Sequence, residues 1–195
     1  MSLAPTPLSR ILGVLGALGG IALLAAFFSV IPSDVNYIRI FLFLSGGVAV
    51  VIAVYLRQRA TAPRLALIGA LPAVVLGSWL FVMEVLLVGR EPPAFGGTFG
   101  WVFFWASLSA WLAFSWFGVV ALWIGHVTRL GAGALAVGAL LGTLGIDRLG
   151  LVQPGVENVF SILALSGIFV HGLGLVLLGL EVALRARRAP PAAAA

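Results

Sequence analysis

The chain has 195 residues, of which 62% are hydrophobic and only 9% are charged. Soluble domains contain about 45–50% apolar and about 25% charged residues, so a water-soluble protein of this length could not bury so much apolar surface. The net charge of +5 is not taken as a sign of nucleic-acid binding, because basic residues in a membrane protein first report topology. The composition predicts an integral membrane protein.

A helix needs roughly 20 apolar residues, within a range of about 17–25, to cross the hydrocarbon core. Six apolar segments of the sequence have this length. Helices are predicted because backbone groups in hydrocarbon must find their hydrogen bonds within the segment. The predicted fold is therefore an all-α integral membrane protein, a six-helix transmembrane bundle that forms one domain over residues 1–184. In chain order the predicted spans cover residues 11–31, 38–56, 65–88, 101–124, 130–146 and 159–184.

The two ends of the sequence need separate interpretation. The first apolar segment could be a cleaved signal peptide, but its 21 residues exceed the usual length of about 7–15, and we predict a true span. The last stretch, "RARRAPPAAAA" at residues 185–195, is basic and then low in complexity. It predicts a disordered C-terminal tail.

The distribution of arginine predicts the orientation of the six spans. If both termini are cytoplasmic, eight arginines fall on the inner side and three on the outer side, which fits the positive-inside rule. We therefore expect a multi-pass protein of a bacterial cytoplasmic membrane. The inner arginines are Arg10, Arg57, Arg59, Arg64, Arg129, Arg185, Arg187 and Arg188, and the outer ones are Arg39, Arg90 and Arg148.

Small residues predict where the helices meet, since lipid supplies no hydrophobic drive for helix association. Gly16 and Gly20 form one glycine pair at i and i+4, and Gly138 and Gly142 form another. In the last span, His171 shares a helix face with glycines at i−4 and i+3. His171 is therefore expected to point into the bundle rather than toward lipid.

An ionisable residue within the hydrocarbon is costly and marks a candidate functional site. The candidate intramembrane polar site consists of Glu84, His171 and Arg39. Glu84 has two interpretations: a structural ion pair with Arg39, which is favoured, or a cation- or proton-coupled carboxylate facing a cavity. For His171, an interhelical hydrogen bond is favoured over a proton relay or ligand contact. Glu181 is expected at the inner interface, one turn before Arg185.

Four tryptophans of the segment 101–124 fall on one helical stripe, namely Trp101, Trp105, Trp116 and Trp123. A stripe that faces lipid or a neighbouring helix is the favoured interpretation, since tryptophan is enriched at membrane interfaces. The alternative is an aromatic wall for a flat or apolar ligand, with Trp105 and Trp116 as its deeper members.

The sequence holds no motif that predicts catalysis. Hydrolase, metalloprotease and nucleotide-binding signatures are absent, and a chain without cysteine has no thiolate metal site or cysteine nucleophile. The two histidines, His126 and His171, are predicted at membrane depths too different for both to ligate one haem. We predict no catalytic residue, no metal and no cofactor.

Three functions are consistent with these features, in order of preference. The first is a non-catalytic structural or accessory subunit of a membrane assembly. The second is a small transporter or an apolar-ligand-binding membrane protein that uses Glu84 and His171. The third is a membrane-embedded enzyme. The expected partners are the lipid bilayer and either a second copy of the chain or other membrane subunits, with no nucleic acid.

Overall fold

The computed structural model describes residues 7–27, 36–87, 98–143 and 157–184, and the statements below concern these residues. Every regular element within them is an α-helix, so the all-helical prediction is confirmed for the described part of the chain. The helices are α1 (Pro7–Phe27), α2 (Asn36–Gln58), α3 (Pro63–Leu87), α4 (Thr98–Ile124), α5 (Arg129–Thr143) and α6 (Glu157–Leu184).

The helix bounds differ from the predicted spans by a few residues. α3 begins at Pro63, and α4 begins at Thr98, three residues before the predicted start at Trp101. Proline is favoured at the first position of a helix, where its missing N–H would have no intrahelical partner, and this explains the starts of α1 and α3. α3 continues as a helix through Pro72. α5 is the shortest helix, with 15 residues.

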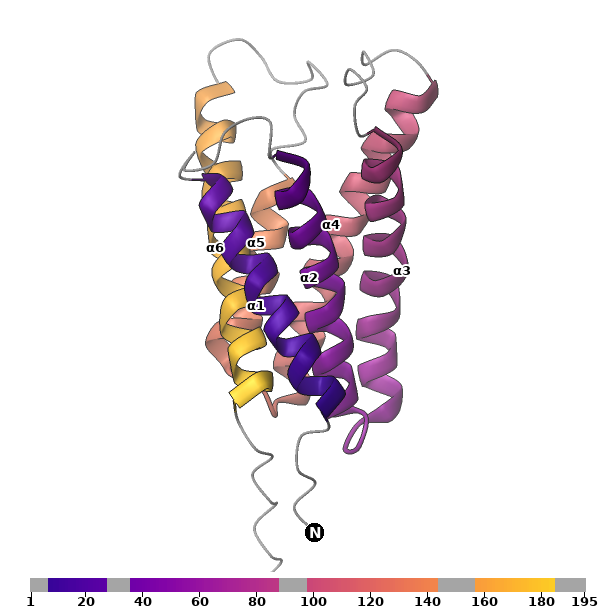
Figure 1. The fold of residues 1–195 in the computed structure, drawn as a ribbon, viewed down its shortest axis with the longest axis vertical. Coiled ribbons are helices and arrows are strands. Elements are labelled where there is room, and N and C mark those ends of the chain that lie inside the picture. The colour runs from indigo at the N-terminus through magenta and orange to yellow at the C-terminus, as the bar shows by residue number, and fades with distance from the viewer. Residues whose placement is uncertain (1–6, 28–35, 88–97, 144–156, 185–195) are drawn as a thin grey trace, which may run out of the picture.

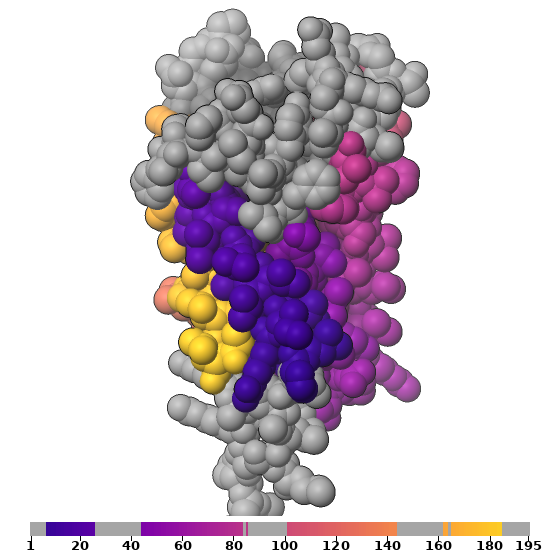
Figure 2. Space-filling model, viewed as in Figure 1, coloured from indigo at the N-terminus to yellow at the C-terminus, as the bar shows by residue number. Residues whose placement is uncertain are grey.

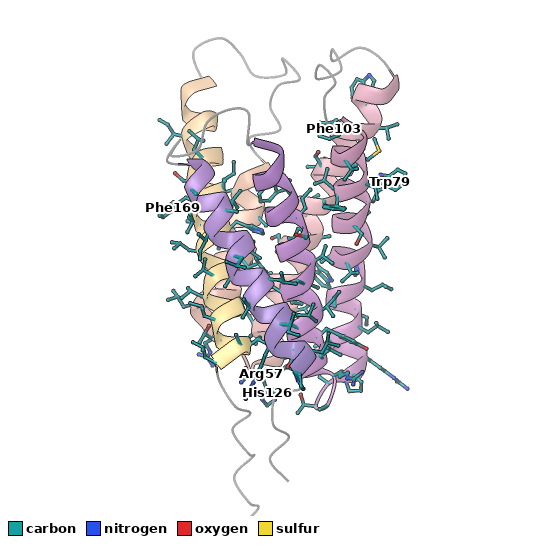
Figure 3. The ribbon with its side chains drawn as sticks, in the orientation of Figure 1. Arg57, Trp79, Phe103, His126 and Phe169 are labelled. Atoms are coloured by element: carbon teal, nitrogen blue, oxygen red, sulfur yellow. The ribbon has the colours of Figure 1, made fainter. Side chains whose placement is uncertain are left out.

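The six helices run up and down and form a closed arrangement (Figure 1). Each helix packs against its neighbour in the chain, and α1 packs against α6 to close the circuit. The turns at residues 59–62 and 125–128 both lie at the end of the bundle where α1 begins and α6 ends. We call this the short-loop end. Figure 3 shows Arg57 and His126 there.

Apolar side chains fill the interior of the bundle. Phe114 of α4 lies at its centre, because a Cβ on Gly47 of α2 or on Gly77 of α3 would meet its ring at 3.1 Å. Glycine at these two positions lets the ring lie directly against both helices. The fully buried side chains around it include Val50, Val51, Val54, Phe117, Leu135, Leu175 and Leu178.

The outward faces of the helices are apolar as well. Large hydrophobic side chains are exposed along α1, α3, α4, α5 and α6, and Figure 2 shows the α1, α2 and α3 side of the molecule. Four helical segments are long and apolar enough to cross a membrane, and α2 and α5 contribute shorter apolar segments, Leu44–Gln58 and Arg129–Thr143. The four long segments are Pro7–Ala25, Pro63–Met83, Trp101–Ile124 and Leu165–Leu184.

The glycine pair of α1 contacts two different helices. A Cβ on Gly16 would collide with the side chain of Val50 in α2, whereas a Cβ on Gly20 would lie 2.5 Å from the carbonyl oxygen of Gly172 in α6. The 40° offset between positions i and i+4, at about 100° per residue, is enough to turn the two glycines toward separate neighbours. α1 therefore packs closely against both α2 and α6.

Candidate functional site

His171 lies on α6 in the interior of the bundle and is 0% exposed. Its Nδ1 lies 3.4 Å from the carbonyl oxygen of Leu135 on α5. A carbonyl oxygen can only accept, so this hydrogen bond requires the proton on Nδ1. The inward orientation predicted for His171 is what the structure has, and the long distance makes the bond a weak one.

Two aromatic rings of α4 enclose the imidazole. The ring centroids of Trp111 and His171 lie 5.0 Å apart at an interplanar angle of 65°, and those of Phe114 and His171 lie 5.6 Å apart at 77°. Both pairs are edge-to-face, an arrangement that is favourable between aromatic quadrupoles. We call His171, Trp111, Phe114 and Leu135 the His171 cluster. It joins α4, α5 and α6 at one point.

The backbone of α5 approaches the backbone of α6 at the same level. A Cβ on Gly138 would overlap the backbone nitrogen of His171 and would lie 2.8 Å from the carbonyl oxygen of Gly167. On the opposite helix, a Cβ on Gly167 would lie 2.5 Å from the backbone nitrogen of Gly142. Glycines on both helices thus place the His171 backbone against α5, and this contact decides where the imidazole lies.

The His171 cluster is therefore suited to packing and to one interhelical hydrogen bond. The imidazole contacts the rings of Trp111 and Phe114, and the backbone of His171 lies against the backbone of α5. Among the described residues, no group of three or more histidine, aspartate or glutamate side chains is placed to hold a metal ion.

The other two members of the predicted polar site cannot be placed beside His171. Arg39 belongs to α2 and Glu84 belongs to α3, but their side chains lie outside the described residues. The ion pair predicted between them stays a prediction.

The tryptophan stripe of α4 lies on the outer surface of the bundle. Trp105 is 56% exposed and Trp116 is 43% exposed, and Trp101 and Trp123 are exposed as well. Trp116 also donates its Nε1–H to the carbonyl oxygen of Ile68 on α3, at 3.3 Å. The stripe that faces lipid or a neighbouring helix and the aromatic wall for a ligand both stay predictions. The tryptophan that reaches the interior is Trp111, which the stripe does not include.

Sequence reasoning missed Gln58, which is fully enclosed at the end of α2. Its Nε2 donates to the carbonyl oxygens of Gly125 at 2.9 Å and of Ala121 at 3.3 Å. Ala121 lies in the last turn of α4, and its carbonyl oxygen also accepts a hydrogen bond from the backbone N–H of Gly125. Gly125 directly follows α4, where carbonyl acceptors lack intrahelical partners. Gly125 and His126 both have positive φ, 72° and 63°, and turn the chain from α4 toward α5. A glycine that follows an apolar helix is the sequence signal that could have predicted this end of α4.

Glu181 has a defined role that its position in the sequence did not reveal. It is buried near the end of α6, and its Oε2 accepts a hydrogen bond of 2.6 Å from the backbone nitrogen of Thr128. Thr128 directly precedes α5, so the carboxylate lies at the positive end of the α5 dipole. Only the fold brings Glu181 to the start of α5.

His126 and His171 occupy different environments. His126 lies in the exposed turn between α4 and α5 at the short-loop end, labelled in Figure 3, whereas His171 is enclosed within the bundle. The two imidazoles therefore do not form one site. Comparison of the chain with protein-family models, with curated proteins and with solved structures finds no match.

Proposed function

We propose that the chain is a multi-pass protein of a bacterial cytoplasmic membrane, in which all six helices cross the bilayer and both termini are cytoplasmic. The exposed apolar faces of the helices support embedding in lipid. The orientation is supported by the five arginines whose side chains the structure describes, each of which lies at the short-loop end, in the first or last turn of a helix or in the turn 59–62. They are Arg10, Arg57, Arg59, Arg64 and Arg129.

The proposed orientation can be tested by cysteine accessibility, because the native chain has no cysteine. Ala60→Cys lies in the exposed turn 59–62, and Ser33→Cys lies in the segment that connects α1 to α2. In intact cells, a membrane-impermeant maleimide should label Ser33→Cys and should label Ala60→Cys only after lysis. The opposite pattern would reverse the topology, and labelling of both sites in intact cells would contradict a six-span chain.

Within this membrane protein, we propose a non-catalytic role as a structural or accessory subunit. The enclosure of His171 carries this proposal. A histidine that relays protons or binds a ligand needs access to water or to the ligand, whereas this imidazole is packed between Trp111 and Phe114 and against the backbone of α5. The partners of such a subunit would be the lipid bilayer and a second copy of the chain or other membrane subunits.

The accessibility of position 171 tests this role. His171→Cys and Leu175→Cys, which is also fully buried on α6, should resist water-soluble methanethiosulfonate reagents added from either side, and Ala60→Cys should react as the exposed control. Leu175→Cys keeps the test valid if His171→Cys does not fold. Reaction of either buried cysteine from one side of the membrane would contradict the structural role. It would indicate a small transporter or an apolar-ligand-binding protein instead.

A further inference from the structure

The short-loop end carries a concentration of positive charge. Four of its described arginines, Arg10, Arg59, Arg64 and Arg129, have exposed side chains. The one described acidic side chain at this end, Glu181, is buried and accepts a hydrogen bond from Thr128. Among the described residues, the exposed charge at this end is therefore entirely positive, and it would attract anions.

One of these arginines lies beside a seam between two helices that is lined by tryptophan. The hydrogen bond from Trp116 of α4 to the carbonyl oxygen of Ile68 places these two residues side by side. Arg64 precedes Ile68 by one turn of α3, about 6 Å toward the short-loop end, and Trp123 follows Trp116 by two turns of α4, about 10 Å in the same direction. Positions four or seven apart share a helix face. Arg64 therefore lies at a level between the two tryptophans.

The surface of this seam is apolar and open. Ile68, Trp116 and Trp123 are all exposed, and Trp123 is 74% exposed. Beneath them the helices are in close contact, because a Cβ on Gly69 would lie 2.7 Å from a methyl group of Val120. The seam is thus a shallow apolar surface, and Arg64 lies beside it at a level between Trp116 and Trp123. No described residue forms an ion pair with Arg64.

This combination fits one class of molecule. A guanidinium binds a phosphate through paired, charge-assisted hydrogen bonds. Tryptophan is suited to the boundary between headgroups and acyl chains, and exposed aliphatic side chains are suited to the chains themselves. A free phosphate would use only the arginine, whereas a phospholipid would use the arginine and the apolar surface together.

We propose that the α3–α4 seam at the short-loop end binds an anionic phospholipid. Its phosphate contacts Arg64, its acyl chains lie along Ile68 and Trp116, and Trp123 lies beside its headgroup region. The inference requires that the protein is embedded in a membrane, as proposed above, but it does not depend on the orientation or on the subunit role. The cysteine-labelling test of the orientation and the test of lipid binding can therefore fail independently of each other.

The test uses the full chain reconstituted in phosphatidylcholine vesicles that contain a small fraction of lipid with dibrominated acyl chains, which quench tryptophan fluorescence on contact. Dibrominated phosphatidylglycerol should quench more than the same fraction of dibrominated phosphatidylcholine. Arg64→Gln should lower this preference by about fivefold, the effect expected for one arginine at a membrane surface. Trp116→Phe should remove much of the extra quenching, because Trp116 lies on the acyl-chain side of Arg64 and is 43% exposed.

Arg10→Gln is the matched control, because it removes one exposed arginine at the same end from a helix that does not contact α3 or α4. It should leave the preference unchanged. Equal quenching by both lipids, an unchanged Arg64→Gln variant, or equal losses from both arginine variants would overturn the site. Displacement by added inorganic phosphate at the concentration of the anionic lipid would show that the phosphate alone is recognised, which would also overturn it.

Discussion

His171 contributes to the fold through its shape and through one hydrogen bond. Its ring fills the space between Trp111, Phe114 and α5, and its Nδ1 approaches the carbonyl oxygen of Leu135. A buried ring of this size excludes both lipid and water from the junction of three helices. Because the imidazole has polar atoms, its hydrogen bond favours one orientation of the side chain at that junction. An aliphatic side chain would have no such preference.

Replacing His171 by alanine should therefore lower the free energy of unfolding by about 2–4 kcal/mol, as expected for a cavity in a packed core. Reversible unfolding in mixed micelles would measure this change. Leu180→Ala is the matched control on α6, because Leu180 is 43% exposed and faces outward. Equal losses from the two variants would contradict a packing role for His171.

Gln58 links two helix ends through its side-chain amide. Gln58→Ala should cost about 1–3 kcal/mol, because it leaves the carbonyl oxygens of Ala121 and Gly125 without their side-chain donor. Hydrogen exchange should become faster in the last turn of α4 and in the turn 125–128. Arg59→Ala, at the exposed neighbouring position, should leave exchange there unchanged. Similar exchange in both variants would show that Gln58 does not hold this end of α4.

At the scale of the helices, close backbone contact determines the packing. α5 meets α6 through Gly138 and Gly142 on one side and Gly167 on the other, so the two backbones lie nearer than any larger side chain would allow. Van der Waals contact of this kind drives helix association in lipid. The same contact sets the depth and rotation of α6, and with them the position of His171.

Two glycines of α5 provide a matched pair of variants. Gly138→Ala should destabilise the protein by about 1–3 kcal/mol, because its Cβ would press on the backbone of His171 and Gly167. A Cβ on Gly133 meets nothing within 4 Å, so Gly133→Ala should stabilise α5 by about 0.5–1 kcal/mol through helix propensity. Unfolding measurements on both variants test the contact. A tolerated Gly138→Ala would mean that α5 and α6 are not closely packed at this level.

At the scale of the whole molecule, the bundle is apolar both inside and outside. Its centre is filled by side chains such as Phe114 and Leu175, and its outer face carries side chains such as Ile11 and Leu130. A soluble bundle would place polar residues on its outer face. The arginines whose side chains are described lie instead at the short-loop end, together with Gln58.

This distribution predicts the behaviour of the protein during fractionation. The chain should stay with the membrane pellet after extraction with alkaline carbonate and should enter solution only with detergent, because its outer face is unsuited to water. Immunoblotting of the fractions measures this, with a peripheral membrane protein as the control that carbonate removes. Release of the chain by carbonate would contradict embedding in the bilayer.

The sequence by itself determined the kind of fold and the approximate limits of the helices. The lengths of apolar segments, proline at the starts of α1 and α3 and glycine after α4 are local signals, and they act within one helix or turn. The helical face of His171 could be inferred in the same way, since residues at i−4 and i+3 share a face. Each of these features depends on residues that are near one another in the chain.

Only the tertiary structure decided which residues surround His171 and which helix ends are joined. Trp111 and Phe114 lie beside His171, Gln58 reaches the end of α4, and Glu181 reaches the start of α5, although these residues are far apart in sequence. The physical reason is that glycine fixes how closely two helices approach but does not identify the partner. The partner depends on how all six helix faces fit together, and the packing of the whole bundle determines that fit.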